Sequence, residues 1–201
     1  MIQIGGIQMR NKIVIGVLAS LMALSCARGG VPAGWWAAGE DEYEFGVDKT
    51  VVRDGKPSAY IASITNTPKQ FTSMSQMLSA EKYAGKRVKL SGYLKTKNVK
   101  KWAGFWLRVD GKDVDNMNEK GGFAFATMQD NGALSGNTDW TGAKLVLDVP
   151  LEAKEIVFGV ILDGVGKVWI NNVKFEVVSK DEPLTNYSDM KTEPVNLDFS
   201  K

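Results

Sequence analysis

From Tyr43 onward, hydrophobic and polar positions alternate in short runs that are separated by turn residues. In Arg87–Lys95, for example, Val88, Leu90 and Leu94 alternate with charged or hydroxyl-bearing residues. A period of two residues is typical of a β-strand with one buried and one solvent-exposed face. No stretch of this part shows the longer period of an extended amphipathic helix. The pattern therefore predicts an all-β protein.

Nine of these runs have clear bounds, within a total of about nine or ten expected strands. The predicted strands are Tyr43–Asp48, Ser58–Ser63, Phe71–Leu78, Arg87–Lys95, Gly104–Asp110, Phe123–Met128, Ala143–Val149, Glu155–Leu162 and Val168–Val177. We expect Asp163–Gly166 to join the last two strands as a hairpin. We also expect one helical turn at Ser79–Gly85, with Ser79 as its N-cap and Gly85 as its left-handed end.

The connections between the strands distinguish two all-β architectures. An eight-stranded lipocalin-like barrel has sequential hairpins, whereas this chain has long connecting segments at Pro32–Glu42 and Asp110–Gly122. We therefore expect a two-sheet antiparallel jelly-roll sandwich with one short helical turn. The most basic segment, Lys95–Lys101, is expected to be a solvated loop between two strands.

The first residues have the pattern of an export signal. Arg10 and Lys12 precede an apolar run, Ile13–Leu24, and small residues follow it. The run has about 12 residues, fewer than the ~20 that a membrane-spanning helix needs. We interpret this segment as a signal peptide, with translation starting at Met1 or at Met9.

The single cysteine, Cys26, follows this run and has two interpretations. As a lipid-modified residue, it makes residues 1–26 a signal peptide of the lipoprotein type and anchors the mature protein in the cell envelope. Ordinary cleavage near the same position leaves a periplasmic or secreted protein instead. We expect the lipid anchor, because a lone cysteine lies directly after the apolar run.

After residue 26 the chain divides into three parts, a lead-in at 27–42, the sandwich at 43–179 and a tail at 180–201. Within the tail, Pro194–Ser200 resembles the strand with which such sandwiches often begin. An exposed sheet edge has unpaired backbone groups that another strand can cover. The tail is therefore a candidate for an added edge strand, and a frayed tail is the alternative.

Composition narrows the range of functions. The 201 residues, of which 44% are hydrophobic and 24% charged, are enough for one globular core. The sequence contains no histidine, which excludes Ser-His-Asp and Cys-His catalysis and histidine-ligated zinc. A single cysteine excludes an internal disulfide, a CxxC redox pair and an iron–sulfur cluster.

The charge balance argues against a polyanionic partner. The formal net charge of the full chain is +2. Removal of residues 1–25 takes away Arg10 and Lys12 and leaves 23 basic and 23 acidic residues. Because nucleic-acid binding needs a clustered positive field, we expect no nucleic-acid partner for the mature protein.

Several motifs along the chain carry a family resemblance. They are Gly34–Trp36, Tyr43–Asp48 and Gly55–Ile61 at the start, Tyr83–Tyr93 and Trp102–Asp110 in the middle, and Thr138–Trp140, Leu147–Pro150, Phe158–Val160 and Gly166–Val173 at the end. Together they resemble a bacterial jelly-roll domain related to carbohydrate-binding modules and galactose-binding-like domains. The resemblance covers nearly all of Gly34–Ser179. It implies a jelly-roll domain that occurs behind signal peptides or fused to helix-turn-helix regulators, mostly without an assigned ligand.

The chain departs from that family in two places. Phe125–Asp130 stands where the family usually has an Asp-Asn-Met-Gln-Asp-like segment, and Asp115–Met117 supplies a related pattern upstream. Related calcium-stabilised sandwiches have a carboxylate near the last strand, where this chain has Asn171 and Asn172. Uncharged amides are weaker calcium ligands. No metal site and no cofactor are therefore predicted, and structural calcium stays an open alternative.

The candidate ligand-binding residues centre on the predicted strand Gly104–Asp110. Its alternation places Trp106 and Arg108 together on the face that points away from the core. An indole ring beside hydrogen-bonding groups suits a sugar, whose apolar face stacks on the ring. The other candidate ligand-binding residues are Gln76, Gln129, Asp130 and Trp102. In the alternative, Trp106 packs under a loop and Arg108 pairs with an acid.

These observations predict a binding protein rather than an enzyme. Glycoside hydrolysis needs two carboxylates across a cleft, and no such pair can be placed from the sequence, so no catalytic residue is predicted. We expect an exported, non-catalytic domain that recognises carbohydrate or another small polar ligand through a sheet face with Trp and Arg. The alternative is a structural or protein-interaction module of the cell envelope. Membrane contact is expected only through a lipid on Cys26.

Overall fold

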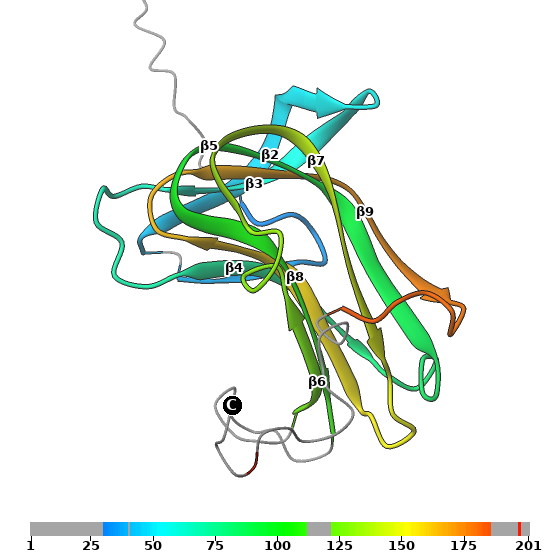
Figure 1. Ribbon diagram of the computed structural model, residues 1–201. Coiled ribbons are helices and arrows are strands. Elements are labelled where there is room, and N and C mark those ends of the chain that lie inside the picture. The colour runs from blue at the N-terminus through cyan, green and yellow to red at the C-terminus, as the bar shows by residue number, and fades with distance from the viewer. Residues whose placement is uncertain (1–29, 40, 112–121, 186–196, 198–201) are drawn as a thin grey trace, which may run out of the picture.

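One long strand connects the two sheets of the protein. The computed structural model describes residues 30–39, 41–111, 122–185 and 197 (Figure 1). In its first half, β5 (Arg87–Asp110) pairs with β7 (Leu134–Asp148) and β9 (Lys167–Val178). In its second half, it pairs with β6 (Gly122–Thr127) and β8 (Glu155–Asp163). The two halves of β5 thus belong to different sheets.

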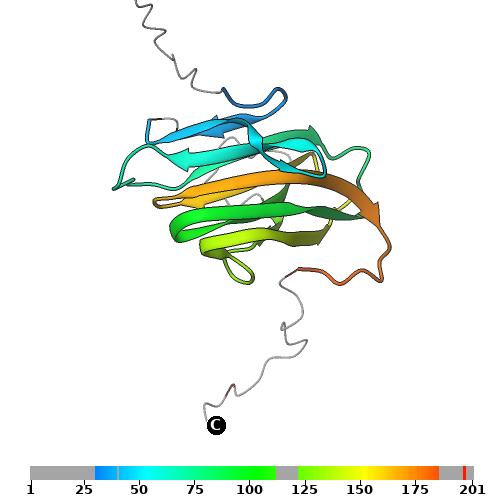
Figure 2. The same ribbon diagram turned by 90° about the horizontal axis from the view of Figure 1, so that it is seen from above.

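The remaining strands extend each sheet outward from β5. The sheet that we call the β8 sheet has the order β1-β4-β8-β5-β6, where β1 is Trp36–Ala38 and β4 is Thr72–Ser79. The β9 sheet has the order β7-β5-β9-β3-β2, where β2 is Tyr43–Arg53 and β3 is Lys56–Ser63. Figure 2 shows β9 in orange between β3 and β5. All pairings are antiparallel, which confirms the predicted jelly-roll sandwich.

The core lies between the two sheets and follows the alternation in the sequence. Val88, Leu90 and Leu94 in the first half of β5 are buried, as are Phe105 and Leu107 in the second half. Other fully buried side chains include Ile61, Met74, Leu145, Leu147, Ile156 and Leu162. Because strand side chains point alternately to opposite faces, the polar residues between them face outward.

The basic segment Lys95–Lys101 is not a loop, contrary to our prediction. It is part of β5, which is one continuous strand from Arg87 to Asp110. Thr96 and Val99 are buried within this segment, and Thr96 exchanges hydrogen bonds with Thr138. The chain continues as a strand because β7 pairs with it while it passes from one sheet to the other.

The predicted hairpin at Asp163–Gly166 is also wrong. This segment connects β8 to β9, which lie in different sheets and do not pair with each other. It crosses close to the backbone of β5, since a Cβ added to Gly166 would lie 2.6 Å from the Cα of Val99. Glycine is needed here because the crossover leaves no room for a side chain.

The predicted helical turn is present after β4. The Ala84 N–H donates to the Ala80 carbonyl at 2.9 Å, and the Glu81 N–H donates to Ser79 Oγ at 3.3 Å. Gly85 ends the turn with a φ of +74°. A single turn is sufficient because it only links β4 to the start of β5.

Several predictions fall on residues outside the described ranges. These are the signal segment with Cys26, Asp115–Met117 and most of Pro194–Ser200. Strand β1 lies within the segment that we assigned to the lead-in. Among the described residues, no helix is long and apolar enough to cross a membrane.

The start of the tail lies along the edge of the β9 sheet. The Thr185 N–H donates to the Val146 carbonyl at 3.0 Å, and the Val146 N–H donates to Thr185 Oγ1 at 2.8 Å. Arg87 Nη1 donates to the carbonyls of Lys180 and Glu182. The described part of the tail therefore covers part of the outer edge of β7.

Candidate functional site

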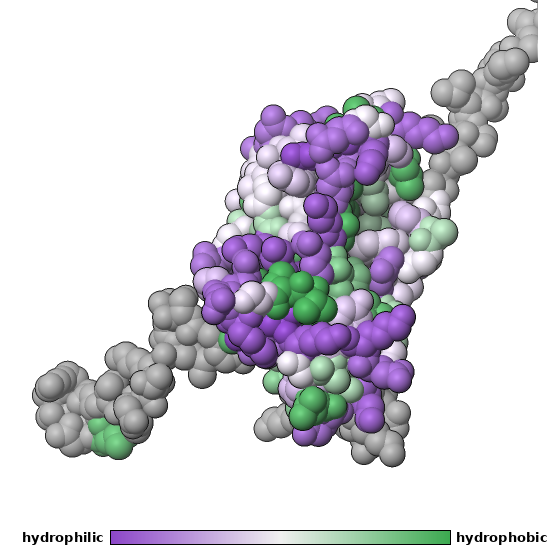
Figure 3. All heavy atoms as spheres, turned by 90° about the vertical axis from the view of Figure 1, so that its right-hand side faces the viewer, coloured by the Kyte–Doolittle hydropathy of each residue, from purple (hydrophilic) through white to green (hydrophobic). Residues whose placement is uncertain are grey.

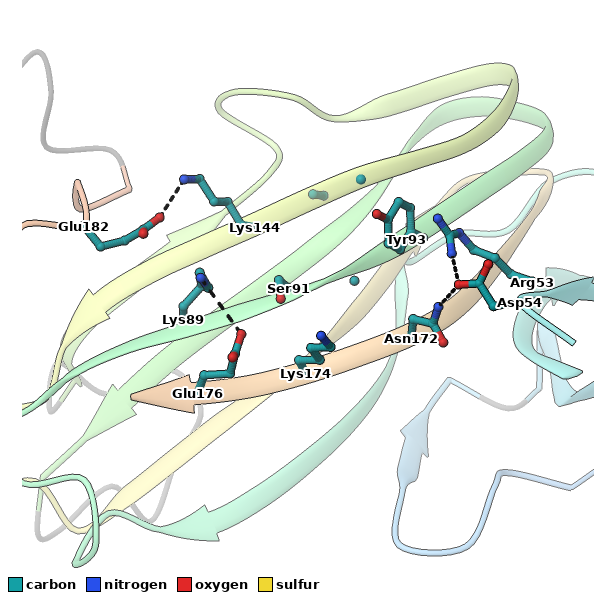
Figure 4. Close-up of a pocket in the computed structure, with 13 residues that line it drawn as sticks. Arg53, Asp54, Lys89, Ser91, Tyr93, Lys144, Asn172, Lys174, Glu176 and Glu182 are labelled. Carbon is teal, nitrogen blue, oxygen red and sulfur yellow. Dashed lines mark hydrogen bonds and ion pairs between the residues drawn. The ribbon is translucent and has the colours of Figure 1, made fainter. Parts of the chain in front are cut away.

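A groove crosses the outer face of the β9 sheet and is formed by residues from four strands and the tail. Ser91 and Tyr93 of β5 lie along its floor, with Gly142 and Lys144 of β7 on one side. Asn172, Lys174 and Glu176 of β9 lie on the other side (Figure 4). The groove has a volume of about 780 Å³. This size lies within the range of ordinary ligand-binding clefts.

The strand register fixes the order of side chains along the groove. Lys144, Ser91 and Lys174 form one row, because Ser91 is the Cα partner of both lysines. Tyr93 lies in the next row, where its partner on β7 is Gly142. Because Gly142 has no side chain, one side of the Tyr93 ring has no neighbouring side chain. A Cβ added at Gly142 would lie 3.4 Å from the nearest atom of this ring.

A bulge in β9 places Asn172 beside this row. The pairing shifts between Ser91 and Tyr93, so that β9 has one additional residue at this point. Asn172 has a φ of +51°, the left-handed conformation that is common for Asn at such positions. The bulge brings the Asn172 amide to the β2–β3 hairpin, where its Nδ2 donates to Asp54 Oδ2 at 2.6 Å.

The tip of the β2–β3 hairpin closes one end of the groove. The Cζ of Arg53 lies 3.4 Å from the centroid of the Tyr93 ring, and Arg53 also pairs with Asp54 (Figure 4). A second bulge, between Asp48 and Val52, precedes this tip and bends the strand. A guanidinium stacked on a phenol ring forms a cation–π contact, so the two planar groups form one surface.

Most charged groups in the groove are paired. Lys144 Nζ lies 2.6 Å from Glu182 Oε1, and this lysine lowers the pKa of Glu182. Lys89 Nζ lies 3.9 Å from Glu176 Oε2. Lys174 has no ion pair within the part of the chain that the structure describes. The unpaired charge of the groove is therefore positive and lies beside Ser91.

Hydrophilic side chains are spread over the right-hand side of Figure 1, with paler areas and smaller hydrophobic patches between them (Figure 3). The outer face of β3 and β9 continues the polar surface with a connected cluster. Trp169 Nε1 donates to Asp48 Oδ2 at 2.9 Å, and Lys167 Nζ lies 3.7 Å from the centroid of the Tyr60 ring. These contacts make the cluster a support for the bend of the hairpin.

Hydrogen bonds control the protonation of Asp48 in this cluster. Partial burial by itself would raise the pKa of Asp48. The hydrogen bonds from Trp169, from Thr50 and from the Val51 N–H together lower this pKa by a larger amount. The net effect holds the pKa of Asp48 well below its usual range. The carboxylate therefore stays ionised to a lower pH than an ordinary aspartate.

The residues that we predicted as a ligand site lie on the other sheet. Trp106 and Arg108 belong to the second half of β5 and face away from the core, as expected. Trp106 is only 5% exposed, and its Nε1 has no hydrogen-bond partner among the residues that the structure describes. Arg108 Nε donates to Asp110 Oδ2 at 2.7 Å, a pairing that the alternative interpretation of this strand anticipated.

The structure separates the other predicted site residues. Gln76 pairs with Phe158 of β8, whereas Trp106 pairs with the adjacent Gly159, so Gln76 faces the opposite side of the β8 sheet. There it lines a second cleft, about 590 Å³ in volume, between the two sheets. An offset of one residue reverses the face that a strand side chain occupies.

Three predicted residues lie near one end of the β8 sheet. Trp102 is half-buried and lies over Gly104, on the same face as Trp106. Gln129 and Asp130 are exposed in the turn that follows β6. The Gln129 N–H donates to Thr127 Oγ1 at 3.2 Å. The structure thus brings these three residues near the Trp106 face and excludes Gln76 from it.

Sequence reasoning missed the groove residues Arg53, Tyr93, Lys144 and Lys174. Lys89, Ser91 and Tyr93 were visible as the exposed positions of an alternating strand. Their neighbours on β7 and β9 are distant in sequence, and no local pattern identifies which strands flank β5. In the described part of the chain, no group of three or more Cys, Asp or Glu residues could hold a metal ion.

Comparisons with known proteins agree with this architecture. No protein-family model matches the sequence. The chain is 37% identical over 174 residues to an uncharacterized HTH-type transcriptional regulator, YbfP, of Bacillus subtilis (strain 168). The match covers 84% of this chain and 57% of that regulator, so the chain spans little more than half the length of this relative.

Two solved structures show the same fold at low sequence identity. The CBM22-1 xylan-binding domain of Xyn10C from Paenibacillus barcinonensis is similar with a TM-score of 0.50 and 17% identity, over 76% of this chain and 90% of that domain. The enzymatically active domain of tailspike protein 4 from bacteriophage CBA120 is similar with a TM-score of 0.55 and 16% identity, over 73% of this chain and 20% of that protein. The fold is therefore shared with a xylan-binding domain and with 20% of the tailspike chain.

Proposed function

We propose that this protein binds a carbohydrate, without catalysing a reaction on it, in the groove of the β9 sheet. The observation that carries the proposal is the surface formed by Tyr93 and Arg53 beside the open position of Gly142. The apolar face of a pyranose ring packs against planar groups, and its hydroxyls need hydrogen-bonding partners. Ser91 and Asn172 lie next to this surface and offer such partners.

The fold supports the same conclusion in general terms. A xylan-binding domain shares this architecture, and fold similarity alone does not assign a ligand. The binding site of this protein is therefore argued from its own side chains. The relative of Bacillus subtilis is described as a transcriptional regulator, and a ligand-binding role for this domain is compatible with that description.

The state of the groove carboxylates supports binding rather than hydrolysis. A glycosidase needs one carboxylic acid with a raised pKa beside a second carboxylate. Here Asp54, Glu176 and Glu182 each contact a cationic side chain, and the pKa of Glu182 is lowered rather than raised. These carboxylates are suited to fixing the lysines and the arginine in place.

A glycan array followed by titration calorimetry tests the proposal. The wild-type protein is expected to bind a saccharide, and Tyr93→Ala is expected to weaken binding about tenfold, because an aromatic contact contributes ~0.5–1.5 kcal/mol beyond its buried area. Phe125→Ala is the matched control, since Phe125 is an exposed aromatic residue on β6 of the other sheet. Its binding should equal that of wild type.

Two further variants test the other candidate face. Trp106→Ala and Arg108→Ala alter the β8 sheet, and each is compared with wild type after its folding is checked by circular dichroism. Loss of binding in these variants, with Tyr93→Ala unaffected, would move the site to the Trp106 face. No saccharide binding by a well-folded protein would contradict the proposal and favour a structural or protein-interaction module.

We also propose that the protein is exported and anchored in the cell envelope through a lipid on Cys26. The support is the order of the N-terminal sequence, in which Arg10 and Lys12, the apolar run and then the single cysteine follow one another. A lipid anchor would hold the domain at the membrane surface, where its groove stays open to extracellular or periplasmic saccharides.

A further inference from the structure

We infer that the groove binds an acidic carbohydrate, with the anionic group of the sugar between Lys144 and Lys174. This inference rests on the proposed function and specifies the class of ligand. Lys144 on β7 and Lys174 on β9 are both Cα partners of Ser91. Two lysines from different strands therefore flank one small hydroxyl-bearing residue.

The spacing of the strands makes this pair suitable for holding one anion. Neighbouring strands lie ~4.8 Å apart, so the two lysine Cα atoms are roughly 10 Å apart across β5. Their flexible four-carbon side chains can bring both ammonium groups to a single carboxylate or sulfate above Ser91. The Ser91 hydroxyl adds a hydrogen-bond donor at the floor of the groove.

The distribution of charge in the groove points to a ligand of negative charge. Arg53 contacts Asp54, Lys89 lies near Glu176, and Lys144 contacts Glu182. Lys174 is exposed and has no ion pair among the described residues. A neutral sugar would leave that charge unused, whereas an anionic group forms a charge-assisted contact with it.

The protein itself shows that this region accepts a carboxylate. Glu182 belongs to the tail rather than to the sheet, and its Oε1 lies 2.6 Å from Lys144 Nζ. Figure 4 shows this contact at the end of the groove opposite Arg53 and Tyr93. An anionic ligand would therefore compete with Glu182 for Lys144 while it binds Lys174 directly.

The position of the row also fits a sugar that bears an anionic group. Tyr93 follows Ser91 by two residues on the same face of β5. Two residues along a strand correspond to ~6.6 Å, a span that a pyranose ring reaches together with an exocyclic anionic group. A ring against Tyr93 and Arg53 thus places its substituent near Lys144 and Lys174.

The test compares neutral, carboxylated and sulfated polysaccharides with the full chain. The probes are polygalacturonate with its methyl ester, and dextran sulfate with unmodified dextran, together with an array of uronic-acid and neutral oligosaccharides. We expect the protein to bind the saccharides that carry an anionic group and to bind their neutral counterparts more weakly. Affinity should also fall as salt is raised, because the lysines are exposed. The carboxylated and sulfated arms distinguish the two sources of the charge.

Variants of opposite expected effect locate the site. Lys174→Gln and Lys144→Gln should each weaken binding of the acidic ligand about five- to tenfold, as expected for a charge-assisted contact in a partly exposed site. Glu182→Gln should strengthen binding, because it releases Lys144. Lys100→Gln is the matched control, since Lys100 is an exposed lysine of β5 outside the groove, and it should bind as wild type does.

The outcomes separate this inference from the proposed function. Equal or tighter binding of neutral saccharides, or unchanged affinity in both lysine variants, would overturn the inference and leave the proposed function intact. Failure of the folded protein to bind any saccharide would overturn both. Preference for an acidic saccharide that is lost in Lys174→Gln and retained in Lys100→Gln would support both.

Discussion

The guanidinium carbon of Arg53 lies 3.4 Å from the centroid of the Tyr93 ring, although the two residues belong to strands that are not neighbours. Strand β2 is the edge strand of the β9 sheet, and β9 and β3 lie between it and β5. The hairpin must fold over the sheet to make this contact. Arg53 therefore lines the groove only because the β2–β3 hairpin has this folded shape.

Replacement of Arg53 tests whether this contact contributes to binding. Arg53→Lys keeps the charge but lacks the planar fork that stacks on an aromatic ring. We expect Arg53→Lys and Arg53→Ala to weaken saccharide binding to a similar extent, by about five- to tenfold, with less than ~1 kcal/mol lost from the free energy of unfolding. Calorimetry measures the first effect and urea denaturation the second. Wild-type affinity in both variants would contradict a binding role for Arg53.

The stability of the protein should fall in acid because two aspartates are held ionised. The hydrogen bond from Arg87, and to a smaller extent the one from Lys180, lower the pKa of Asp148 to about 2, although burial acts in the opposite direction. The pKa of Asp48 is also lowered. A carboxyl whose folded-state pKa is lowered stabilises the fold fully above its ordinary pKa of ~3.9. That contribution is lost as the pH falls from about 4 through the folded-state value.

The melting temperature measured between pH 7 and pH 2 tests this expectation. Asp148→Asn should be less stable than wild type at pH 7 and should lose less stability on acidification, because it has no proton to gain at that position. Asp130→Asn is the control, since Asp130 is exposed in a turn and has no ion pair in the described residues. Identical acid profiles for Asp148→Asn and wild type would argue against the contribution of this carboxylate.

Gly159 of β8 is expected to be essential for the packing of the β8 sheet. A Cβ at this position would overlap the Met74 carbonyl oxygen and would lie 2.9 Å from Ser75 Cα. Because both contacts are backbone, the two strands would have to move apart. We expect Gly159→Ala to lower the free energy of unfolding by about 1–3 kcal/mol.

Gly142→Ala provides the matched comparison for this effect. Its nearest contact would be a Tyr93 ring atom at 3.4 Å, which is ordinary packing. Its unfolding free energy should remain within about 0.5 kcal/mol of wild type. Similar unfolding curves for Gly159→Ala and Gly142→Ala would show that the close approach of β4 to β8 does not exclude a side chain at position 159.

Truncation of the tail tests whether its first residues are part of the fold. A chain that ends after Ser179 lacks the hydrogen bonds of Thr185 to Val146 and of Arg87 to the tail carbonyls. We expect its melting temperature to fall by roughly 3–6 °C, from a loss of about 1–2 kcal/mol. A chain that ends after Thr185 keeps these contacts, so its melting temperature should fall less.

The same pair of truncations tests the predicted edge strand of Pro194–Ser200. If this segment covers a sheet edge, the chain that ends after Thr185 should melt several degrees below the full chain. An unchanged melting temperature would eliminate the edge strand. It would leave the contacts of Lys180–Thr185 as the structural part of the tail.

The lipid anchor can be tested at Cys26 itself. Cells that express the full chain are labelled with a fatty acid, and membranes are separated from soluble protein. We expect wild-type protein to carry the label and to fractionate with membranes, and Cys26→Ser to lose both properties, because the thiol is the attachment point. Unlabelled wild-type protein in the soluble fraction would favour ordinary signal-peptide cleavage.

The sequence alone was sufficient for the fold class and for most strand positions. Alternation in Arg87–Lys95 and in Gly104–Asp110 identified the inward and outward faces of both halves of β5, because the side-chain period of a strand is a local property. Ser79 and Gly85 likewise predicted a turn whose hydrogen bonds are formed within a few residues. The absence of histidine and the single cysteine also limited the chemistry without any knowledge of the fold.

Only the tertiary structure determined which faces meet and which residues form a groove. Lys144 and Lys174 flank Ser91 because β7 and β9 both pair with β5, and no nearby residue specifies that pairing. Gln76 is separated from Trp106 because β8 lies between β4 and β5 and the register differs by one residue. Strand order and register depend on the packing of the whole core, so a binding site made from several strands can be recognised only after the sandwich has formed.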